Sequence, residues 1–340
     1  MSRIFFWRAG DTDASSFYRC VEPGRVLRAR GHQVTVDRQA GLADLMMSDV
    51  VVIQRPTEVP ARHVMEKLRS LPEGKRPRLV VELDDDLFSV PEHNPAHPMM
   101  ADPDRRYRLE QAIEDADRIT VTNRHLGRVT RGHLPAERIR VVPNYVPERF
   151  VVAKVPELGA LGTPVLTWAG SDTHRRDFDE VAVALRRLLR ERDDFRVRIV
   201  GAPYAARLRT SLGADLDGRG GARVVQVPWV EGVPRYVPTL TGHIGLAPLA
   251  DDVFNRSKSD LRLKELAARG MVVVASNVGP YGDSCVPRMH VDSVELTWAG
   301  QLTTLLDAAW RLPYTMDALD WAQANTLEAH AHEWEKALLD

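Results

Sequence analysis

Short apolar runs alternate along the chain with longer stretches in which apolar residues recur every three or four positions. In the first half the apolar runs predict strands at residues 4–7, 33–36, 50–54, 78–83, 118–121 and 138–142. The stretches between them predict helices, among them residues 18–30, which end at Gly31, and residues 106–116. Strands that alternate with helices in this way form βαβ units around a parallel sheet.

The same pattern restarts after a connection at residues 151–163 that contains proline and glycine. Further strands are predicted at residues 164–168, 196–200, 223–227, 244–247 and 271–275. A helix at residues 178–191 follows the first of them, and Asp177 with Glu180 predicts a capping box at its start. A chain of 340 residues is also long for one domain and sufficient for two. We therefore expect two doubly wound α/β domains, at residues 1–150 and 151–317.

Composition excludes several classes of protein. Lys and Arg total 46 against 47 for Asp and Glu, so the formal charge of −1 gives no overall attraction to nucleic acid or anionic lipid. The two cysteines provide neither a disulfide framework nor a thiolate zinc site. No apolar run has the length of a membrane span, and the apolar residues at the N-terminus have the length of a strand rather than of a signal peptide. A cytoplasmic protein is the expectation.

Residues 254–276 predict a polar loop, a helix and a buried strand, and carry the clearest candidate chemistry. Ser259 is predicted as the N-cap with Asp260 in the first helical position, and Gly270 as the left-handed C-cap. A helix N-terminus offers free N–H groups and partial positive charge to an anion. Its start is also surrounded by cationic side chains, those of Arg256, Lys258 and Arg262. With Glu265 further along the helix, this arrangement favours a nucleotide diphosphate and its ribose.

Two loops that follow predicted strands are further candidates. Gly170 and Ser171 would let a phosphate approach the backbone, and His174 would either donate to a phosphate oxygen or face solvent. The loop after the first strand contains Ser15 and Ser16, which would contact a sugar or phosphate oxygen or else cap a helix. This loop lacks G-x-G-x-x-G, which argues against a nicotinamide or flavin enzyme.

Three consecutive carboxylates, Asp84, Asp85 and Asp86, follow the predicted strand at residues 78–83. Adjacent carboxylates repel one another unless they are solvated, paired or bound to metal. They predict a divalent ion site, acceptor binding or polarisation of a hydroxyl, or a solvated helix start. Motifs of serine hydrolases, zinc proteases and P-loop NTPases are absent from the sequence.

With these residues assembled, the chain resembles the retaining glycosyltransferases of the GT-B fold, in a bacterial or phage subgroup of the family 4-like enzymes. The run from Glu265 to Ser276 matches the second half of their E-x7-E motif, with Val272 where proline is usual. The first glutamate of that motif would fall on Ser257.

The resemblance implies two Rossmann-like domains that face each other across a cleft, with residues 318–340 crossing back to the first domain. It implies that the second domain holds the nucleotide sugar, with Glu265 on the ribose and Lys258 on the diphosphate. The implied donor-binding residues are Gly170, Ser171, His174, Arg256, Lys258, Ser259, Arg262 and Glu265. The acceptor residues assigned to the first domain are Ser15, Ser16, Arg19, Asp86 and Asn144.

The sequence therefore predicts a glycosyltransferase that moves a sugar from a nucleotide diphosphate, UDP before GDP, to an acceptor hydroxyl with retention. Lys258, Asp84 and Asp85 are its predicted catalytic residues, and no metal or other cofactor is expected. Two alternatives remain: a metal-dependent transferase that uses Asp84 and Asp86, and a non-catalytic two-lobed binding protein. The arginines of residues 105–108 leave a modified DNA base as a lower-ranked acceptor, beside a carbohydrate or small molecule.

Overall fold

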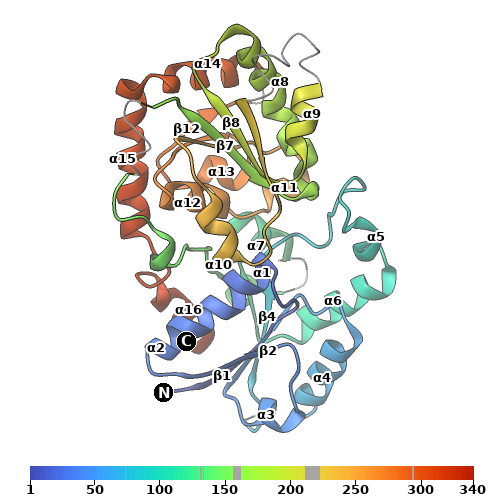
Figure 1. Cartoon of the computed structure of the whole chain (residues 1–340). Coiled ribbons are helices and arrows are strands. Elements are labelled where there is room, and N and C mark those ends of the chain that lie inside the picture. Colours follow the sequence, from blue (N-terminus) through green and yellow to red (C-terminus); the bar gives the residue numbers. More distant parts are fainter. Residues whose placement is uncertain (73, 131, 133, 156–161, 211–222, 293–294) are drawn as a thin grey trace. The chain divides into compact units, whose positions relative to one another are not determined.

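The computed structural model describes residues 1–72, 74–130, 132, 134–155, 162–210, 223–292 and 295–340 (Figure 1). The chain divides into two compact units. Unit 1 contains Met1–Tyr145, Arg256–Ser259 and Leu327–Asp340, and unit 2 contains Val146–Asn255 and Asp260–Thr326. The predicted connection at residues 151–163 lies partly outside the described residues.

Unit 1 is built on a six-stranded parallel sheet of order β2-β1-β3-β4-β5-β6. Its strands are β1 (Arg3–Trp7), β2 (Gln33–Asp37), β3 (Val50–Gln54), β4 (Arg78–Leu83), β5 (Arg118–Val121) and β6 (Ile139–Val141). Its helices are α1 (Ala14–Ser16), α2 (Glu22–Ala29), α3 (Leu42–Met46), α4 (Val59–Arg69), α5 (His97–Met100), α6 (Pro103–Asp115), α7 (Arg124–Thr130) and α16 (Ala331–Leu339), with a π-helix at Phe17–Val21 and a 3-10 turn at Ala136–Arg138.

Strand alternation sends neighbouring side chains of unit 1 to opposite faces of its sheet. Phe5, Val51 and Ile53 face the helices α4 and α6. Ile4, Phe6 and their neighbours on the same face pack instead with α2 and α16. Trp334 of α16 is 1% exposed and meets the ring of Phe6 edge-on. The C-terminal helix is therefore part of the core of unit 1.

Unit 2 has a second six-stranded parallel sheet, of order β12-β11-β10-β7-β8-β9. Its strands are β7 (Val165–Gly170), β8 (Arg196–Gly201), β9 (Val224–Val227), β10 (Ile244–Ala247), β11 (Val272–Ser276) and β12 (Met289–Val291). Its helices are α8 (Arg175–Glu191), α9 (Tyr204–Thr210), α10 (Val233–Tyr236), α12 (Leu261–Ala268), α13 (Gly279–Asp283), α14 (Glu295–Leu306) and α15 (Ala308–Ala324), with 3-10 turns at Glu148–Phe150, Asp172–His174 and Val237–Thr239. Helix α11 (Val253–Arg256) ends where the chain passes from unit 2 to unit 1.

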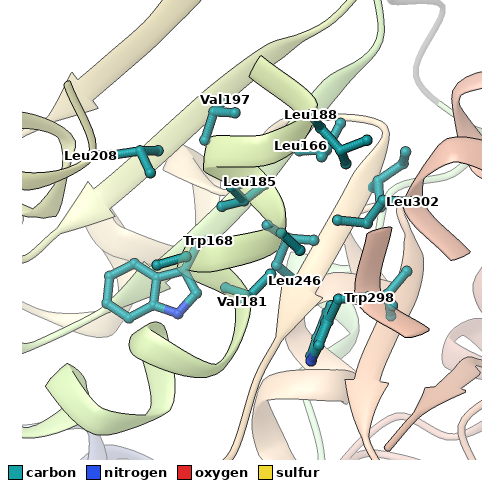
Figure 2. Close-up of a cluster of buried hydrophobic side chains, with 14 of the residues drawn as sticks. Leu166, Trp168, Val181, Leu185, Leu188, Val197, Leu208, Leu246, Trp298 and Leu302 are labelled. Atoms are coloured by element: carbon teal, nitrogen blue, oxygen red, sulfur yellow. The ribbon is translucent and has the colours of Figure 1, made fainter. Parts of the chain in front are cut away.

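One face of the unit 2 sheet packs against α8 and α14 (Figure 2). Val181, Leu185 and Leu188 of α8 lie on the predicted apolar stripe and are at most 2% exposed. The indole of Trp298 from α14 fills the same core and is fully buried. Helices α12 and α15 cover the other face, so both faces of the strands are buried.

Most predicted elements are present, and the differences have local causes. The predicted strands at residues 50–54, 78–83, 118–121 and 244–247 are confirmed without a shift. Strand β12 was not predicted, because Met289–Val291 is only three residues long. The predicted capping box at Asp177 is wrong, since α8 begins earlier, at Arg175. The predicted helix at residues 18–30 begins instead with a π-helical turn.

A substitution of Gly201 would test how closely unit 2 is packed at the end of β8. Its φ is +97°, and a Cβ there would lie 2.4 Å from the carbonyl oxygen of Gly170. We expect Gly201→Ala to lower the free energy of unfolding by about 1–3 kcal/mol through backbone strain, and by more where the clash is not relieved. Gly300→Ala, in α14 with open space around it, is the matched control and should be neutral or stabilising in urea titrations.

Candidate functional site

The carboxyl ends of parallel strands lie on one edge of each sheet, and the candidate residues gather there in both units. Ligands of doubly wound sheets bind at this edge, at the point where the strand order reverses. In unit 1 that point lies between β1 and β3, and in unit 2 between β7 and β10. The structure groups Ser15, Ser16, Arg19, Asp84, Asp85, Asp86, Asn144, Arg256, Lys258 and Ser259 in unit 1, and Gly170, Ser171, His174, Arg262 and Glu265 in unit 2.

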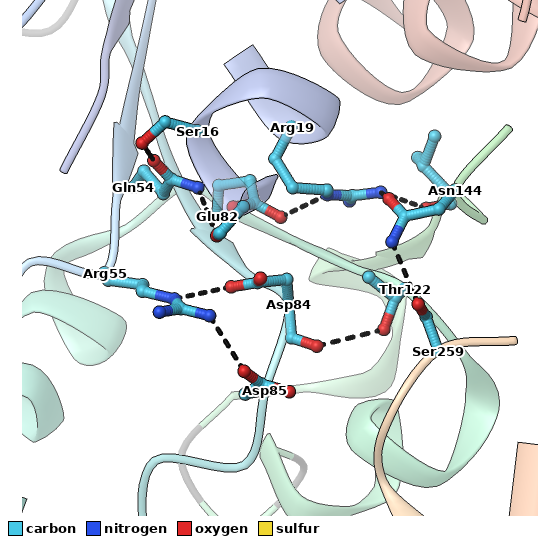
Figure 3. Close-up of polar contacts among 12 residues, drawn as sticks. Ser16, Arg19, Gln54, Arg55, Glu82, Asp84, Asp85, Thr122, Asn144 and Ser259 are labelled. Atoms are coloured by element: carbon cyan, nitrogen blue, oxygen red, sulfur yellow. Dashed lines mark hydrogen bonds and ion pairs between the residues drawn. The ribbon is translucent and has the colours of Figure 1, made fainter. Parts of the chain in front are cut away.

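A buried ion pair anchors the edge of unit 1 (Figure 3). The Nε of Arg19 donates to Oε1 of Glu82 at 2.6 Å, and both residues are fully buried. The Nη1 of Arg19 donates to the carbonyl of Val142 at 2.7 Å and to Oδ1 of Asn144 at 3.0 Å. Its guanidinium also lies over the ring of Trp334. Arg19, predicted to contact the acceptor, is therefore a buried structural residue.

The π-helical turn explains how Arg19 reaches this position. An α-helix that gains one residue per turn rotates its side chains, and such turns are frequent at functional sites. The alternative that Ser15 or Ser16 caps a helix is wrong, because Asp13 caps the turn by accepting from the N–H of Ser16. Ser15 and Ser16 instead hydrogen-bond the side chain of Gln54 at 2.8 and 2.9 Å. They link the loop after β1 to the end of β3.

Asp84 and Asp85 are held by Arg55, a residue that the sequence analysis missed. The guanidinium donates from Nε to Oδ1 of Asp84 at 2.5 Å and from Nη2 to Oδ2 of Asp85 at 2.9 Å (Figure 3). Burial alone would raise the pKa of Asp84, but Arg55 and a hydrogen bond from Ser15 bring the pKa below its usual value. Burial and the neighbouring Asp84 raise the pKa of Asp85. The two carboxylates therefore differ in proton affinity.

The third carboxylate, Asp86, points elsewhere and is 1% exposed. Its Oδ1 accepts from the backbone N–H of Phe88 at 3.0 Å, as in a turn. This burial does not support the predicted contact between Asp86 and an acceptor. Within the residues that the structure describes, no three His, Cys, Asp or Glu side chains are grouped so as to hold a metal ion.

The segment Arg256–Ser259 is tied to the same edge by two asparagines. The amide of Asn123 donates to the carbonyls of Ser257 and Lys258, at 2.8 Å each. The amide of Asn144 donates to the hydroxyl of Ser259 at 3.0 Å. Lys258 lies near enough to Asp85 to oppose the rise in its pKa. Ser257, in the position of the missing glutamate, is buried.

In unit 2 the opening of α12 differs from the prediction by one or two residues. Asp260, not Ser259, is the N-cap, and its carboxylate does not cap the helix. It pairs instead with Lys264 at 2.9 Å and accepts from the hydroxyl of Ser284 at 2.7 Å. The side chain of Asp260 therefore binds these two partners rather than the N–H groups at the start of the helix. Gly270 has the predicted left-handed conformation after the helix, with φ +71°.

Glu265 lies on α12 and is 3% exposed. Its Oε2 accepts from Nη1 of Arg262 at 2.8 Å, and the same nitrogen contacts the hydroxyl of Tyr236. Burial lowers the pKa of Arg262, but Tyr236 and Glu265 outweigh that effect and raise it. The charged pair is therefore fixed in one geometry.

Gly170 ends β7 with a bare backbone, since a Cβ there would lie 2.8 Å from the ring of Trp168. His174 donates or accepts through Nδ1 at 2.8 Å from Oδ2 of Asp177. The other oxygen of Asp177 accepts from the N–H of Ala250 and the amide of Asn255, at 2.9 Å each. Asp177 therefore joins the loops after β7 and β10, which flank the switch point.

Trp229 is a second residue that the sequence analysis missed. It follows β9 and is 59% exposed, although it is a large aromatic side chain. A Cβ on Gly201 would lie 3.2 Å from its ring, so the indole lies beside the bare backbone at the end of β8. Nothing in its short surrounding motif distinguishes it in sequence from a core tryptophan.

Comparison with solved structures identifies the architecture. The chain is similar to a sucrose-phosphate synthase from Thermosynechococcus elongatus, with a TM-score of 0.68, 16% identity, and coverage of 99% of this chain and 98% of that one. It is similar to Alr3699/HepE from Anabaena in complex with UDP, with a TM-score of 0.68, 12% identity and 99% coverage of each chain. It is also similar to an alpha-glucosyltransferase in complex with UDP-glucose and DNA containing an abasic site, with a TM-score of 0.67, 13% identity and coverage of 96% of each chain.

These likenesses show that the chain has the GT-B fold, and they confirm the predicted fold class. No protein-family model matches the sequence, and no curated protein matches it. No helix among the described residues is both long enough and apolar enough to span a membrane.

The buried Glu82 predicts a pH-dependent stability. Burial, opposed by Arg19, raises its pKa from 4.5 to about 7. Because the folded pKa exceeds the unfolded one, the stabilising contribution is complete below about pH 4.5 and is lost as the pH rises through about 7. We expect the free energy of unfolding to fall between about pH 5 and about pH 8, by up to about 3 kcal/mol from this group.

Urea titrations of Glu82→Gln should show a smaller fall over the same pH range, because glutamine does not titrate. Glu191→Gln, at an exposed position on α8, is the control and should behave like the unaltered protein. An unchanged pH dependence in Glu82→Gln would contradict the assignment.

Proposed function

We propose that the protein is a glycosyltransferase that uses a nucleotide-diphosphate sugar, with UDP as the nucleotide. The observation that carries the proposal is the start of α12, which the side chain of Asp260 does not cap and which has Lys258 just before it and Arg262 in its first turn. Helix N-termini with added cations bind phosphate groups. The solved structures of similar fold include complexes with UDP and with UDP-glucose, which supports the choice of nucleotide.

In this proposal unit 2 binds the donor. The backbone at Gly170 and Ser171 and the N–H groups of α12 bind the diphosphate, and Lys258 adds its charge. Glu265 accepts hydrogen bonds from the ribose hydroxyls, and Arg262 holds the carboxylate in place. His174 is oriented by Asp177 to donate from its other ring nitrogen.

Trp229 supplies the aromatic surface for the nucleobase. Every base has a π-face, and stacking on an aromatic side chain contributes about 1–3 kcal/mol per base. Its exposure and its place beside the bare backbone of Gly201 leave one face of the indole accessible. In this proposal the diphosphate lies at the loop after β7 and the base lies at the loops after β8 and β9, on the same edge of the sheet.

Unit 1 binds the acceptor in the same proposal, through the loops at its own switch point. The acceptor hydroxyl attacks C1 of the sugar from the side on which the diphosphate leaves, so the configuration is retained. The new C1–O bond forms as the C1–O bond to phosphate breaks, the electron pair stays on the diphosphate, and its oxygen takes the acceptor proton. No metal is required, because α12, Lys258 and Arg262 stabilise the leaving group.

A DNA acceptor is not favoured by the arginines of residues 105–108. Arg105 pairs with Glu58, Arg106 with Glu110 at 3.2 Å, and Arg108 donates to the carbonyl of Thr57 at 2.7 Å. Their charge is therefore partly offset within unit 1. A carbohydrate or small molecule is the proposed acceptor class, and a cytoplasmic location is part of the proposal.

Donor binding is tested by calorimetry with UDP. We expect Lys258→Ala and Glu265→Gln each to weaken UDP binding by about 10-fold or more, because a hydrogen bond to a charged group contributes about 1.5–3 kcal/mol. The controls are Lys67→Ala and Glu191→Gln, at exposed positions of α4 and α8. Unchanged affinity in both site variants would rule out the assignment.

The role of Trp229 can be separated from that of the diphosphate site by comparing the binding of UDP with that of pyrophosphate. Trp229→Ala should weaken UDP binding by about 5- to 150-fold, the equivalent of stacking one base, and leave pyrophosphate binding unchanged. Trp229→Phe should retain most of the affinity. Trp310→Ala, on α15 and 60% exposed, is the matched control. Equal losses for UDP and pyrophosphate would show that Trp229 acts on the fold rather than on the base.

A further inference from the structure

Arg55 has an unusual backbone conformation at a significant place in unit 1. Its φ is 45°, and it is the one non-glycine residue with positive φ in the part of the chain that the structure describes. It directly follows β3, on one side of the switch point between β1 and β3. A non-glycine residue in this region is strained, and the conformation persists only where its surroundings hold it.

Three contacts hold Arg55, and all three go to the strand and loop that follow it in the sheet. Its backbone N–H donates to the carbonyl of Glu82 at 3.0 Å. Its guanidinium reaches one oxygen of Asp84 and one of Asp85, at 2.5 and 2.9 Å. A planar fork that bridges two carboxylates fixes the rotation of each of them. Figure 3 shows the fork between the two side chains.

The two carboxylates are not equivalent in this arrangement. The side chain of Asp84 is 12% exposed, whereas that of Asp85 is 30% exposed. Arg55 uses only Oδ2 of Asp85, and Oδ1 has no hydrogen-bond donor among the described residues. Asp84 is therefore the inner member, and Asp85 is the more exposed member, with Oδ1 left over for a further hydrogen-bond donor.

We propose that Arg55 is a positioning residue, which holds Asp85 so that its Oδ1 accepts a hydrogen bond from the acceptor hydroxyl. This inference rests on the proposed glycosyl transfer and adds the residue that orients its acceptor. Ionised Asp85 accepts hydrogen bonds only, so it selects a hydroxyl that donates its proton and exposes its lone pair to C1. That single proton turns from Oδ1 of Asp85 to the diphosphate oxygen as this oxygen gains the electron pair of the breaking C1–O bond, so Asp85 is still ionised after the step.

The charged groups that act on Asp85 are Asp84 in its own loop, Arg55 after β3 and Lys258 in the segment Arg256–Ser259. Asp84 raises the pKa of Asp85, and both cations lower it. Removing the charge of Arg55 should therefore raise this pKa further. As the pH falls, Asp85 would then become protonated at a higher pH than in the unaltered protein. The acidic limb of the activity profile would move to higher pH with it.

The experiment compares Arg55→Gln and Arg55→Lys with Arg62→Gln. Arg62 is the matched control, because it also contacts two carboxylates, those of Glu66 in α4 and Asp115 in α6, but away from the residues of the proposed site. The reaction followed is release of UDP from whichever UDP-sugar of a panel binds most tightly, with water as the acceptor. The second measurement is a ¹³C titration of the Asp85 carboxyl in the protein without donor, assigned with Asp85→Asn.

We expect Arg55→Gln to lower the rate by about 10- to 100-fold, because misplaced reacting groups cost about that much, without weakening donor binding. Its acidic limb and the titration of Asp85 should both move to higher pH. Arg55→Lys keeps the charge and should restore the pH profile but only part of the rate. Arg62→Gln should match the unaltered protein in every measurement.

Two results would overturn the inference. One is a rate and pH profile in Arg55→Gln that match the unaltered protein, and the other is an Asp85 titration that does not move. If Arg55→Gln does not fold, Arg55→Lys decides, since loss of the fork alone should lower the rate. Absence of donor binding by the unaltered protein would instead refute the proposed function, and the titration would still test the link between Arg55 and Asp85.

Discussion

Carboxylates that gather at the end of β4 have to be neutralised, and the local structure of unit 1 follows from this requirement. Glu82, Asp84 and Asp85 lie within four residues, and burial raises the free energy of each charge. Arg19, in a π-helical turn, pairs with Glu82. Arg55, with a left-handed backbone conformation, pairs with Asp84 and Asp85. Both departures from regular geometry place a guanidinium where a carboxylate needs it.

Unit 2 also has a parallel sheet, with a different strand order, but its candidate edge is suited to anions rather than to cations. Its candidate edge carries a helix start that the side chain of Asp260 does not cap, and the carboxylates of Asp177 and Asp260 hold other side chains in place. Asp177 holds His174 and Asn255, while Asp260 holds Lys264 and Ser284. One switch point is thus suited to an anion and the other to hydroxyl groups, although both are formed by parallel strands in doubly wound order.

The sequence predicted the fold well because its signals are local. Buried parallel strands are continuous apolar runs, so residues 50–54 and 78–83 could be delimited without a structure. The stretch around Glu265 is also contiguous, and Gly270 could be assigned its conformation from helix-capping rules alone. Arg55 and Trp229 could not be recognised in this way. The partners of Arg55 begin 29 residues further along the chain, and Trp229 lies beside the backbone of Gly201 on another strand. A single arginine or tryptophan forms no sequence motif that would reveal such a contact.

The same reasoning explains why Arg19 was misassigned. A polar residue in the first helix of a doubly wound domain points toward the ligand edge if the helix is regular, but an inserted π turn changes which side chains face the core. Arg19 lies within the five residues of π-helix and is turned inward to Glu82. The sequence does not mark this contact, because Glu82 is 63 residues further along the chain. The candidate edge of unit 1 is therefore determined by long-range charge pairing, whereas Arg262 and Glu265 of unit 2 lie in one short segment.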